Sequence, residues 1–202
     1  MKERFRISAS HLAGAIALLH NVRALSVPIL TENFRRDLLE EARQYPLRKI
    51  HNFVGSGNDR VEQQMYLQNQ LDTNGHFAQL SSAFQALFDK ATYNRQWFDA
   101  PVVFNDWMVQ KYTTDCVGIT AHRDRTDYRH LICLFVLSGH GQFFISSERQ
   151  RTDQMEIANL PGDVILMPGP GFVGLDARAF HCVENITEER WVFGLRHDES
   201  KL

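Results

Sequence analysis

The chain has 202 residues, 44% of them hydrophobic and 23% charged, and its formal net charge is −2. This balance is typical of an ordinary globular protein, and it argues against tight nonspecific binding of duplex nucleic acid, which usually requires a basic surface. No run approaches the roughly 18 apolar residues of a membrane-spanning helix. The three cysteines, Cys116, Cys133 and Cys182, include no CxxC pair. We therefore expect a cytoplasmic protein without disulfides or membrane attachment.

Helical periodicity dominates the first half of the chain. An apolar run at residues 12–19 follows two serines that could cap a helix. Residues 31–45 and 76–91 repeat apolar side chains at the i, i+3, i+4 spacing of amphipathic helices. Residues 47–70 are polar and mixed, with glycines that predict a mobile loop. The sequence thus predicts three helices, two of them separated by a long loop.

Short β-rich runs separated by turn residues make up the second half. Residues 131–137 form a nearly continuous apolar run, which suits a strand buried on both faces. Short strands that follow helices predict an α+β, mostly β fold: a double-stranded β-helix (jelly roll) over residues 101–198. Residues 1–100 would supply flanking helices and a substrate lid, within one domain spanning 1–202. Further strands are expected at 102–112, 142–145, 155–160, 163–167, 179–183 and 190–196.

A histidine and an aspartate two residues apart are the first candidate metal ligands. Alternate residues of an extended chain face the same side, so His122 and Asp124 can present a nitrogen and an oxygen to one point. The H-x-D pair alone is weak evidence, but His181 offers a second imidazole from a later β-like segment. Two histidines and one carboxylate leave open positions on iron(II) for a bidentate oxo-acid and dioxygen. Because no cysteine pair is spaced for a closed zinc site, we expect iron.

Two arginines follow the second histidine. Arg190 lies nine residues after His181, and Arg196 lies six residues further on. An even separation places both on the same side of a strand, where their forked guanidinium groups could bracket a small diacid. Tyr112, at the end of the strand that precedes the H-x-D pair, could donate a further hydrogen bond to it.

These residues resemble the H-x-D…H…R-x5-R pattern of the AlkB-like 2-oxoglutarate oxygenases, over about residues 102–198. The resemblance implies a catalytic Fe(II) centre that uses 2-oxoglutarate and O2. It implies that Arg190 holds the distal carboxylate of 2-oxoglutarate, that Arg196 lies by the carboxylate near the metal, and that Tyr112 also touches the cosubstrate. The matching residues are His122, Asp124, His181, Arg190, Arg196 and Tyr112.

Three positions depart from that family's pattern. Gln110 and Val192 stand where the family tends to have asparagine, and Thr126 replaces the acidic residue that reads the base, with Asp127 beside it. The departures weaken the assignment to nucleic-acid substrates and leave the oxygenase assignment intact. We therefore expect hydroxylation or oxidative demethylation of a small-molecule or single-nucleotide-like substrate, with AlkB-type demethylation of nucleic-acid bases as the alternative.

Several aromatic or large apolar residues could form a lid that stacks a flipped base, although ordinary packing is the favoured interpretation. They are Phe53, Met65, Tyr66, Trp97, Phe98 and Trp107.

Two other classes of protein remain alternatives. A cupin-like, non-enzymatic ligand-binding module would usually carry an H-x-H pair, which is absent, and would not need the arginine pair. A zinc hydrolase with His-Asp-His ligands would gain nothing from two arginines facing the pocket, and no general base stands at a useful spacing.

Overall fold

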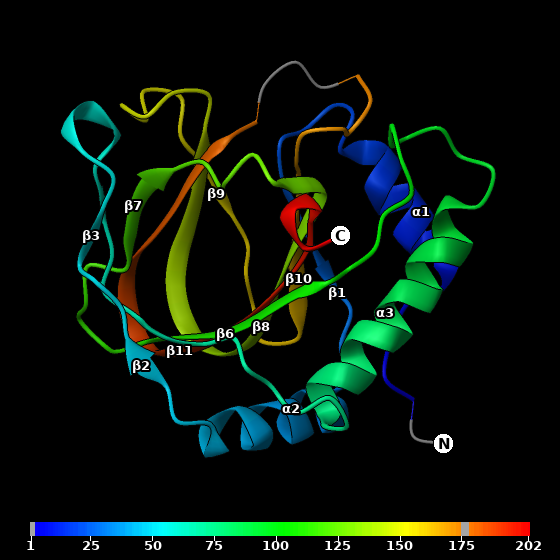
Figure 1. Cartoon of the computed structure of the whole chain (residues 1–202), viewed down its shortest axis with the longest axis horizontal. Helices are drawn as coiled ribbons and strands as arrows, with labels where there is room; N and C mark the ends of the chain where they lie inside the picture. Colours follow the sequence, from blue (N-terminus) through cyan, green and yellow to red (C-terminus); the bar gives the residue numbers. More distant parts are fainter. Residues whose placement is uncertain (1–2, 175–177) are drawn as a thin grey trace.

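The computed structural model describes residues 3–174 and 178–202, and a nine-stranded antiparallel sheet dominates it (Figure 1). The main path of the sheet runs in the order β1-β10-β8-β11-β6-β5-β2, while β7 pairs with β11 and β9 pairs with β8. The helices are α1 (Ala9–Leu18), α2 (Glu32–Gln44) and α3 (His76–Thr92), with 3₁₀ turns η1 (Gly57–Asp59) and η2 (Glu199–Lys201). The strands are β1 (Leu25–Pro28), β2 (Arg48–Lys49), β3 (Phe53–Val54), β4 (Val61–Glu62), β5 (Tyr66–Gln68), β6 (Asp106–Tyr112), β7 (Ile119–His122), β8 (Tyr128–Ser146), β9 (Met155–Ile157), β10 (Asp163–Pro168) and β11 (Phe180–Asp198).

Two long strands, β8 and β11, close the sheet into a jelly roll. They pair with each other along most of their length, and their mutual register shifts between Glu184 and Trp191. One half of β11 pairs with β6 over residues 190–196, and the other half pairs with β7 at His181 and Val183. The result is the mostly β jelly roll with N-terminal helices that the sequence predicts.

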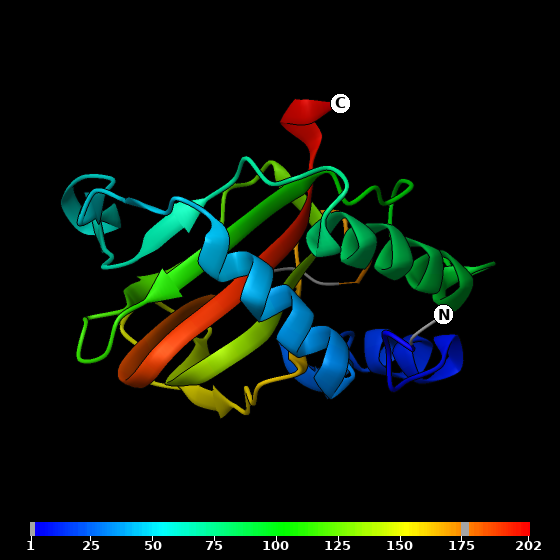
Figure 2. The same ribbon diagram turned by 90° about the horizontal axis from the view of Figure 1, so that it is seen from below.

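The helices cover the outer face of the main sheet, and α2 lies across β8 and β11 in Figure 2. Their apolar stripes meet the alternate sheet residues that point outward, as the two-residue period of a strand requires. Phe84 of α3 packs edge-to-face on Phe135, with ring centroids 5.2 Å apart. Phe77 packs on Phe193 with centroids 4.7 Å apart. This outer face therefore holds the larger part of the hydrophobic core.

The inner face of the same strands lines the interior of the jelly roll. Ile132 and Leu134 of β8 join Tyr112 and Val192 in a second buried cluster, separate from the one under the helices. Both faces of residues 131–137 are thus buried, as that apolar run predicts.

The predicted elements differ from the observed ones in their ends and in their number: the strands predicted at 131–137 and 142–145 form one strand, β8, and those at 179–183 and 190–196 form β11. The first helix begins at Ala9 with Ser8 as its cap, as one of the two serines predicts, and Ser8 and His11 form a capping box. The strand expected over 102–112 begins only at Asp106. Residues 47–70, expected as a loop, contain four short strands and a 3₁₀ turn, and β1 and β7 were also not predicted. Strands of two to four residues carry too few side chains for a periodic signal.

None of the described helices is long and apolar enough to cross a membrane. The three cysteines are free thiols.

Candidate metal centre

The three predicted ligands lie together at one end of β7 and β11. His122 and His181 are direct partners in the register of these strands, and their ring centroids are 4.2 Å apart. Asp124 follows β7 by two residues and brings its Oδ2 atom within 3.7 Å of Nε2 of His181. One ligand atom from each residue lies within 4.8 Å of the others. This spacing suits three ligands of one metal ion, which the sequence pattern predicts.

Neighbouring groups orient each ligand. Nδ1 of His122 lies 2.9 Å from the carbonyl oxygen of Thr120, which can only accept, so Nδ1 is the donor and Nε2 is left for a metal. The ring of His181 stacks on Phe143, with centroids 5.8 Å apart and planes inclined by 20°. Arg178 donates to the backbone carbonyl of Asp124 at 2.5 Å. The two imidazole rings and the backbone of Asp124 are thus held in place.

Burial sets the charges of the ligands. It lowers the pKa of His181 to about 3, and the neighbouring imidazole of His122 acts in the same direction. Burial alone would raise the pKa of Asp124, but the electrostatic influence of His181, Arg196 and other neighbours outweighs it and lowers that pKa. Within the described residues, Oδ2 of Asp124 is buried without a hydrogen-bond partner. A neutral imidazole and an ionised, unpartnered carboxylate are the forms that bind a divalent metal, so the residues fit iron(II).

Arg190 lies deep on the inner face, opposite Tyr112 in the register of β11 and β6. It is 2% exposed, and burial lowers its pKa to about 10. Its Nη2 donates to Oδ1 of Asn159 at 3.1 Å, and its buried Nε has no partner within the described part of the chain. Burial also raises the pKa of Tyr112 to about 12, so its hydroxyl keeps its proton. The two side chains offer hydrogen-bond donors and no negative charge.

Arg196 shares the inner face with Arg190, as their even spacing predicts. Its partner in the register is Asp106, and its guanidinium carbon lies 4.9 Å from the ring centroid of Tyr128. Gly194 makes room for it, because a Cβ atom there would lie 2.6 Å from Nη1 of the arginine. The interior thus contains two almost fully buried arginines on one strand.

Several polar residues in or beside this interior were not predicted from the sequence. Asp106 and Gln110 precede Tyr112 by even numbers of residues, so the alternation of β6 could have placed both on the inner face. Asn159 lies between β9 and β10, and Lys201 lies in η2, where no periodic signal exists. These two positions are set by tertiary structure alone.

The residues predicted as a possible lid are distributed over different parts of the molecule. Trp97, Phe98 and Trp107 pack against the core under the helices. Met65 is buried in the inner cluster, where its sulfur accepts from Gln110. Phe53, in contrast, is 45% exposed on the β3–β4 hairpin, beneath the guanidinium of Arg60. Ordinary packing, the favoured interpretation, therefore holds for most of this set.

No known family model and no curated protein matches this sequence. The fold, however, is found in solved structures. A prolyl hydroxylase from Trichoplax adhaerens, in complex with a hypoxia inducible factor peptide fragment, has a TM-score of 0.71 at 14% identity, covering 96% of this chain and 91% of that one. A 2OG-Fe(II) oxygenase family oxidoreductase from Burkholderia pseudomallei has a TM-score of 0.66 at 14% identity, covering 98% and 94%.

A prolyl-4-hydroxylase from Pseudomonas putida has a TM-score of 0.63 at 15% identity, covering 93% of this chain and 98% of that one. All three matches span nearly the whole length of both chains. The chain thus has the jelly-roll fold found in 2-oxoglutarate- and Fe(II)-dependent oxygenases.

Proposed function

We propose that this protein is an Fe(II)- and 2-oxoglutarate-dependent dioxygenase that oxidises a C–H bond of its substrate. One observation carries the proposal: the His122–Asp124–His181 cluster and the buried Arg190 belong to the same jelly-roll interior. A buried guanidinium without a carboxylate partner among the described residues is costly unless a ligand supplies the negative charge. A metal cluster alone would fit a cupin-like module, but that buried arginine favours a diacid cosubstrate.

The roles of the residues follow from their surroundings. The triad would hold Fe(II), which, when bound, supplies the oxidative chemistry with O2 and 2-oxoglutarate. Arg190, oriented by Asn159, would bind the distal carboxylate of 2-oxoglutarate through its fork. Tyr112 would donate a hydrogen bond, because its raised pKa keeps the hydroxyl protonated. Burial of these groups excludes water and strengthens each interaction.

For the substrate, we propose a small or single-nucleotide-like molecule rather than a nucleic-acid duplex. The net charge of −2 provides no broad basic surface. Four of the six residues that could have stacked a flipped base are buried in the hydrophobic clusters or packed against them. One of the similar solved structures is described with a peptide bound, which makes a peptide the first macromolecule to test.

AlkB-type oxidative demethylation is the second candidate, and the presence of both arginines on the inner face favours it. Methylated single-stranded and double-stranded oligonucleotides should be assayed for succinate release. Succinate formed in proportion to loss of the methyl group would establish this candidate over the small-molecule one. Background turnover unchanged by the oligonucleotide would contradict it.

The proposed chemistry is tested without a known substrate. Fe(II) and 2-oxoglutarate, added without oxygen, should give the weak visible charge-transfer band of a metal-bound oxo-acid. Replacing His181 by alanine should remove the band and most of the bound iron. His140, an exposed histidine, provides the matched control, and His140→Ala should bind iron like the parent. If His181→Ala retains iron as tightly as the parent, the cluster is not the metal site.

The cosubstrate anchor is tested at Arg190. Arg190→Lys keeps the charge but loses the fork, so the affinity for 2-oxoglutarate should fall about tenfold, or about 1.4 kcal/mol. The exposed Arg95 provides the control, and Arg95→Lys should have no effect. Unchanged affinity in both Arg190→Lys and Arg190→Ala would reject the anchor, while a loss confined to variants of Arg196 would transfer this role to that residue.

A further inference from the structure

Two opposite charges, Arg196 and Asp106, face each other on β11 and β6 without forming a close pair. Nη1 of Arg196 lies 3.7 Å from Oδ2 of Asp106, beyond hydrogen-bond distance, although both side chains are only 5% exposed. Within the described residues neither atom has a hydrogen-bond partner, and Nε of the arginine also has none. A buried guanidinium and carboxylate this close normally form short, bidentate hydrogen bonds. Another group must therefore hold the carboxylate back.

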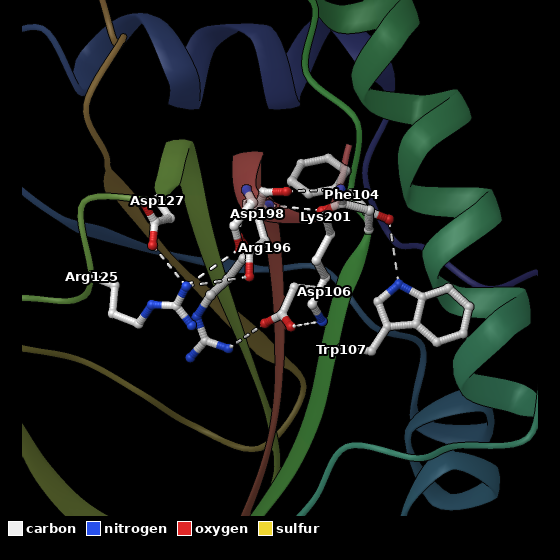
Figure 3. A network of polar contacts seen from close by, with 10 residues as sticks. Phe104, Asp106, Trp107, Arg125, Asp127, Arg196, Asp198 and Lys201 are labelled. Atoms are coloured by element: carbon white, nitrogen blue, oxygen red, sulfur yellow. Dashed lines mark hydrogen bonds and ion pairs between the residues drawn. The ribbon is translucent and has the colours of Figure 1, made fainter.

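That group is Lys201, whose Nζ lies 2.6 Å from Oδ1 of Asp106 (Figure 3). The lysine comes from η2, the last turn of the chain, and this turn is fixed in place. Oδ1 of Asp198 accepts from the backbone nitrogen and the hydroxyl of Ser200, at 3.0 and 2.6 Å. Asn105, next to Asp106, exchanges hydrogen bonds of 3.0 and 2.7 Å with the backbone of Asp198. The turn thus places the ammonium group of Lys201 against the carboxylate of Asp106.

The guanidinium of Arg196 is directed into the interior of the jelly roll. It folds back over Gly194 and lies against the ring of Tyr128. It shares the inner face of β11 with Arg190, and both arginines are buried in the interior that also contains the candidate metal ligands. Among the described residues, Nε and Nη1 of Arg196 have no hydrogen-bond partner, so both can donate to a ligand in this interior.

We propose that Lys201 is a positioning residue: by holding Asp106, it keeps that carboxylate from neutralising Arg196, which stays available to a carboxylate bound beside the metal centre. The identity of this ligand rests on the proposed function, whereas the separation of Asp106 from Arg196 does not. One carboxylate shared by two cations leaves net positive charge in the interior. Without the lysine, the same carboxylate is free to pair with the arginine and to compete with the ligand.

A series of single and double variants tests this competition. The affinity for 2-oxoglutarate is measured by calorimetry in the presence of Mn(II), which allows binding without turnover. Lys201→Ala should weaken binding about tenfold, and Lys201→Arg should leave it near the parental value. Asp106→Asn removes the competing charge, so the double variant Lys201→Ala/Asp106→Asn should recover the parental affinity. Lys90→Ala, at an exposed lysine of α3, is the control and should change nothing.

A purely structural role of the ion pair gives the opposite result, because the double variant would then bind as weakly as Lys201→Ala or more weakly. That outcome overturns the proposal, as does parental affinity in Lys201→Ala.

A crystal structure of Lys201→Ala without ligand tests the same step separately. An oxygen of Asp106 should move to within about 3 Å of a nitrogen of Arg196, and an unchanged separation of 3.7 Å overturns the proposal. If the parent binds no 2-oxoglutarate, the proposed function fails, and this distance still decides the role of Lys201.

Discussion

The two faces of β11 carry opposite kinds of side chain. Trp191, Phe193 and Leu195 point outward and pack in the core beneath the helices. Arg190 and Arg196 alternate with them and point into the jelly roll. Because successive side chains of a strand face opposite sides, one strand stabilises the fold with one set of residues and builds the candidate site with the other.

The two sets have opposite effects on stability. The outward aromatic residues gain free energy from the removal of apolar surface from water and from their mutual contacts. The inward arginines lose hydration, and the described residues provide them with too few hydrogen-bond acceptors to replace it. The outer face must therefore offset what the inner face costs, and substitutions on the two faces should separate stability from ligand binding.

The largest expected effect on stability comes from the outer face. Phe193 is fully buried, 4.7 Å from Phe77 and 6.1 Å from Phe135 between ring centroids. Phe193→Ala should lower the free energy of unfolding by about 3–5 kcal/mol, and Phe193→Leu should lower it less. Urea denaturation measures the loss, and metal titration of the folded variant should give the parental affinity. A variant of full stability with impaired metal binding would contradict the division between the faces.

The same alternation explains how much the sequence could predict. The helices, the strand at 131–137 and the shared face of Arg190 and Arg196 follow from local periodicity, and the structure contains them. That His122 and His181 meet does not follow from spacing alone, because it requires β7 to pair with β11. It could be predicted only from the resemblance of the whole motif to a family with this arrangement.

The polar residues that support the arginines were not predictable in this way. Asn159 reaches Arg190 from a loop, and Lys201 reaches Asp106 from the last turn of the chain. Loop residues have no fixed direction relative to a sheet, so only the folded structure brings these partners together. The main strands of the sheet could thus be read from periodicity, whereas the supporting contacts of the site could not.

A smaller effect, of opposite sign, is expected from the inner face. Arg190→Met replaces a buried cation by an apolar side chain of similar length. Without ligand, this should raise the free energy of unfolding by about 1 kcal/mol or more, because one buried charge that lacks a counter-charge is removed. Urea denaturation of the metal-free protein measures the change, and saturating 2-oxoglutarate with Mn(II) should stabilise the parent but not the variant. If Arg190→Met destabilises the protein strongly, the arginine is a structural element of the interior and the contrast between the faces is wrong at this position.

The smallest effect concerns pH and a histidine pair near the end of β11. The rings of His130 and His197 lie 4.7 Å apart, and both side chains are almost fully buried. Burial lowers both pKa values, although the hydrogen bond that His130 donates to Asp99 acts against this, and Arg129 and Glu199 also face the pair.

The folded protein therefore binds fewer protons than the unfolded chain, in which a histidine titrates near pH 6.5. The stability from these neutral rings is complete above that pH and decreases as the pH falls through it, with a slope of at most about 1.4 kcal/mol per pH unit for each histidine.

Urea denaturation at a series of pH values between 7.5 and 5.5 should show this loss. His197→Gln, which keeps an acceptor for the backbone nitrogen of Val103, should reduce the slope, whereas His140→Gln, at an exposed site, should leave it unchanged. An equal slope in the parent and in His197→Gln would show that His197 does not contribute to the pH dependence. Because the pair lies outside the metal centre, metal affinity at pH 7.5 should be the same in all three proteins.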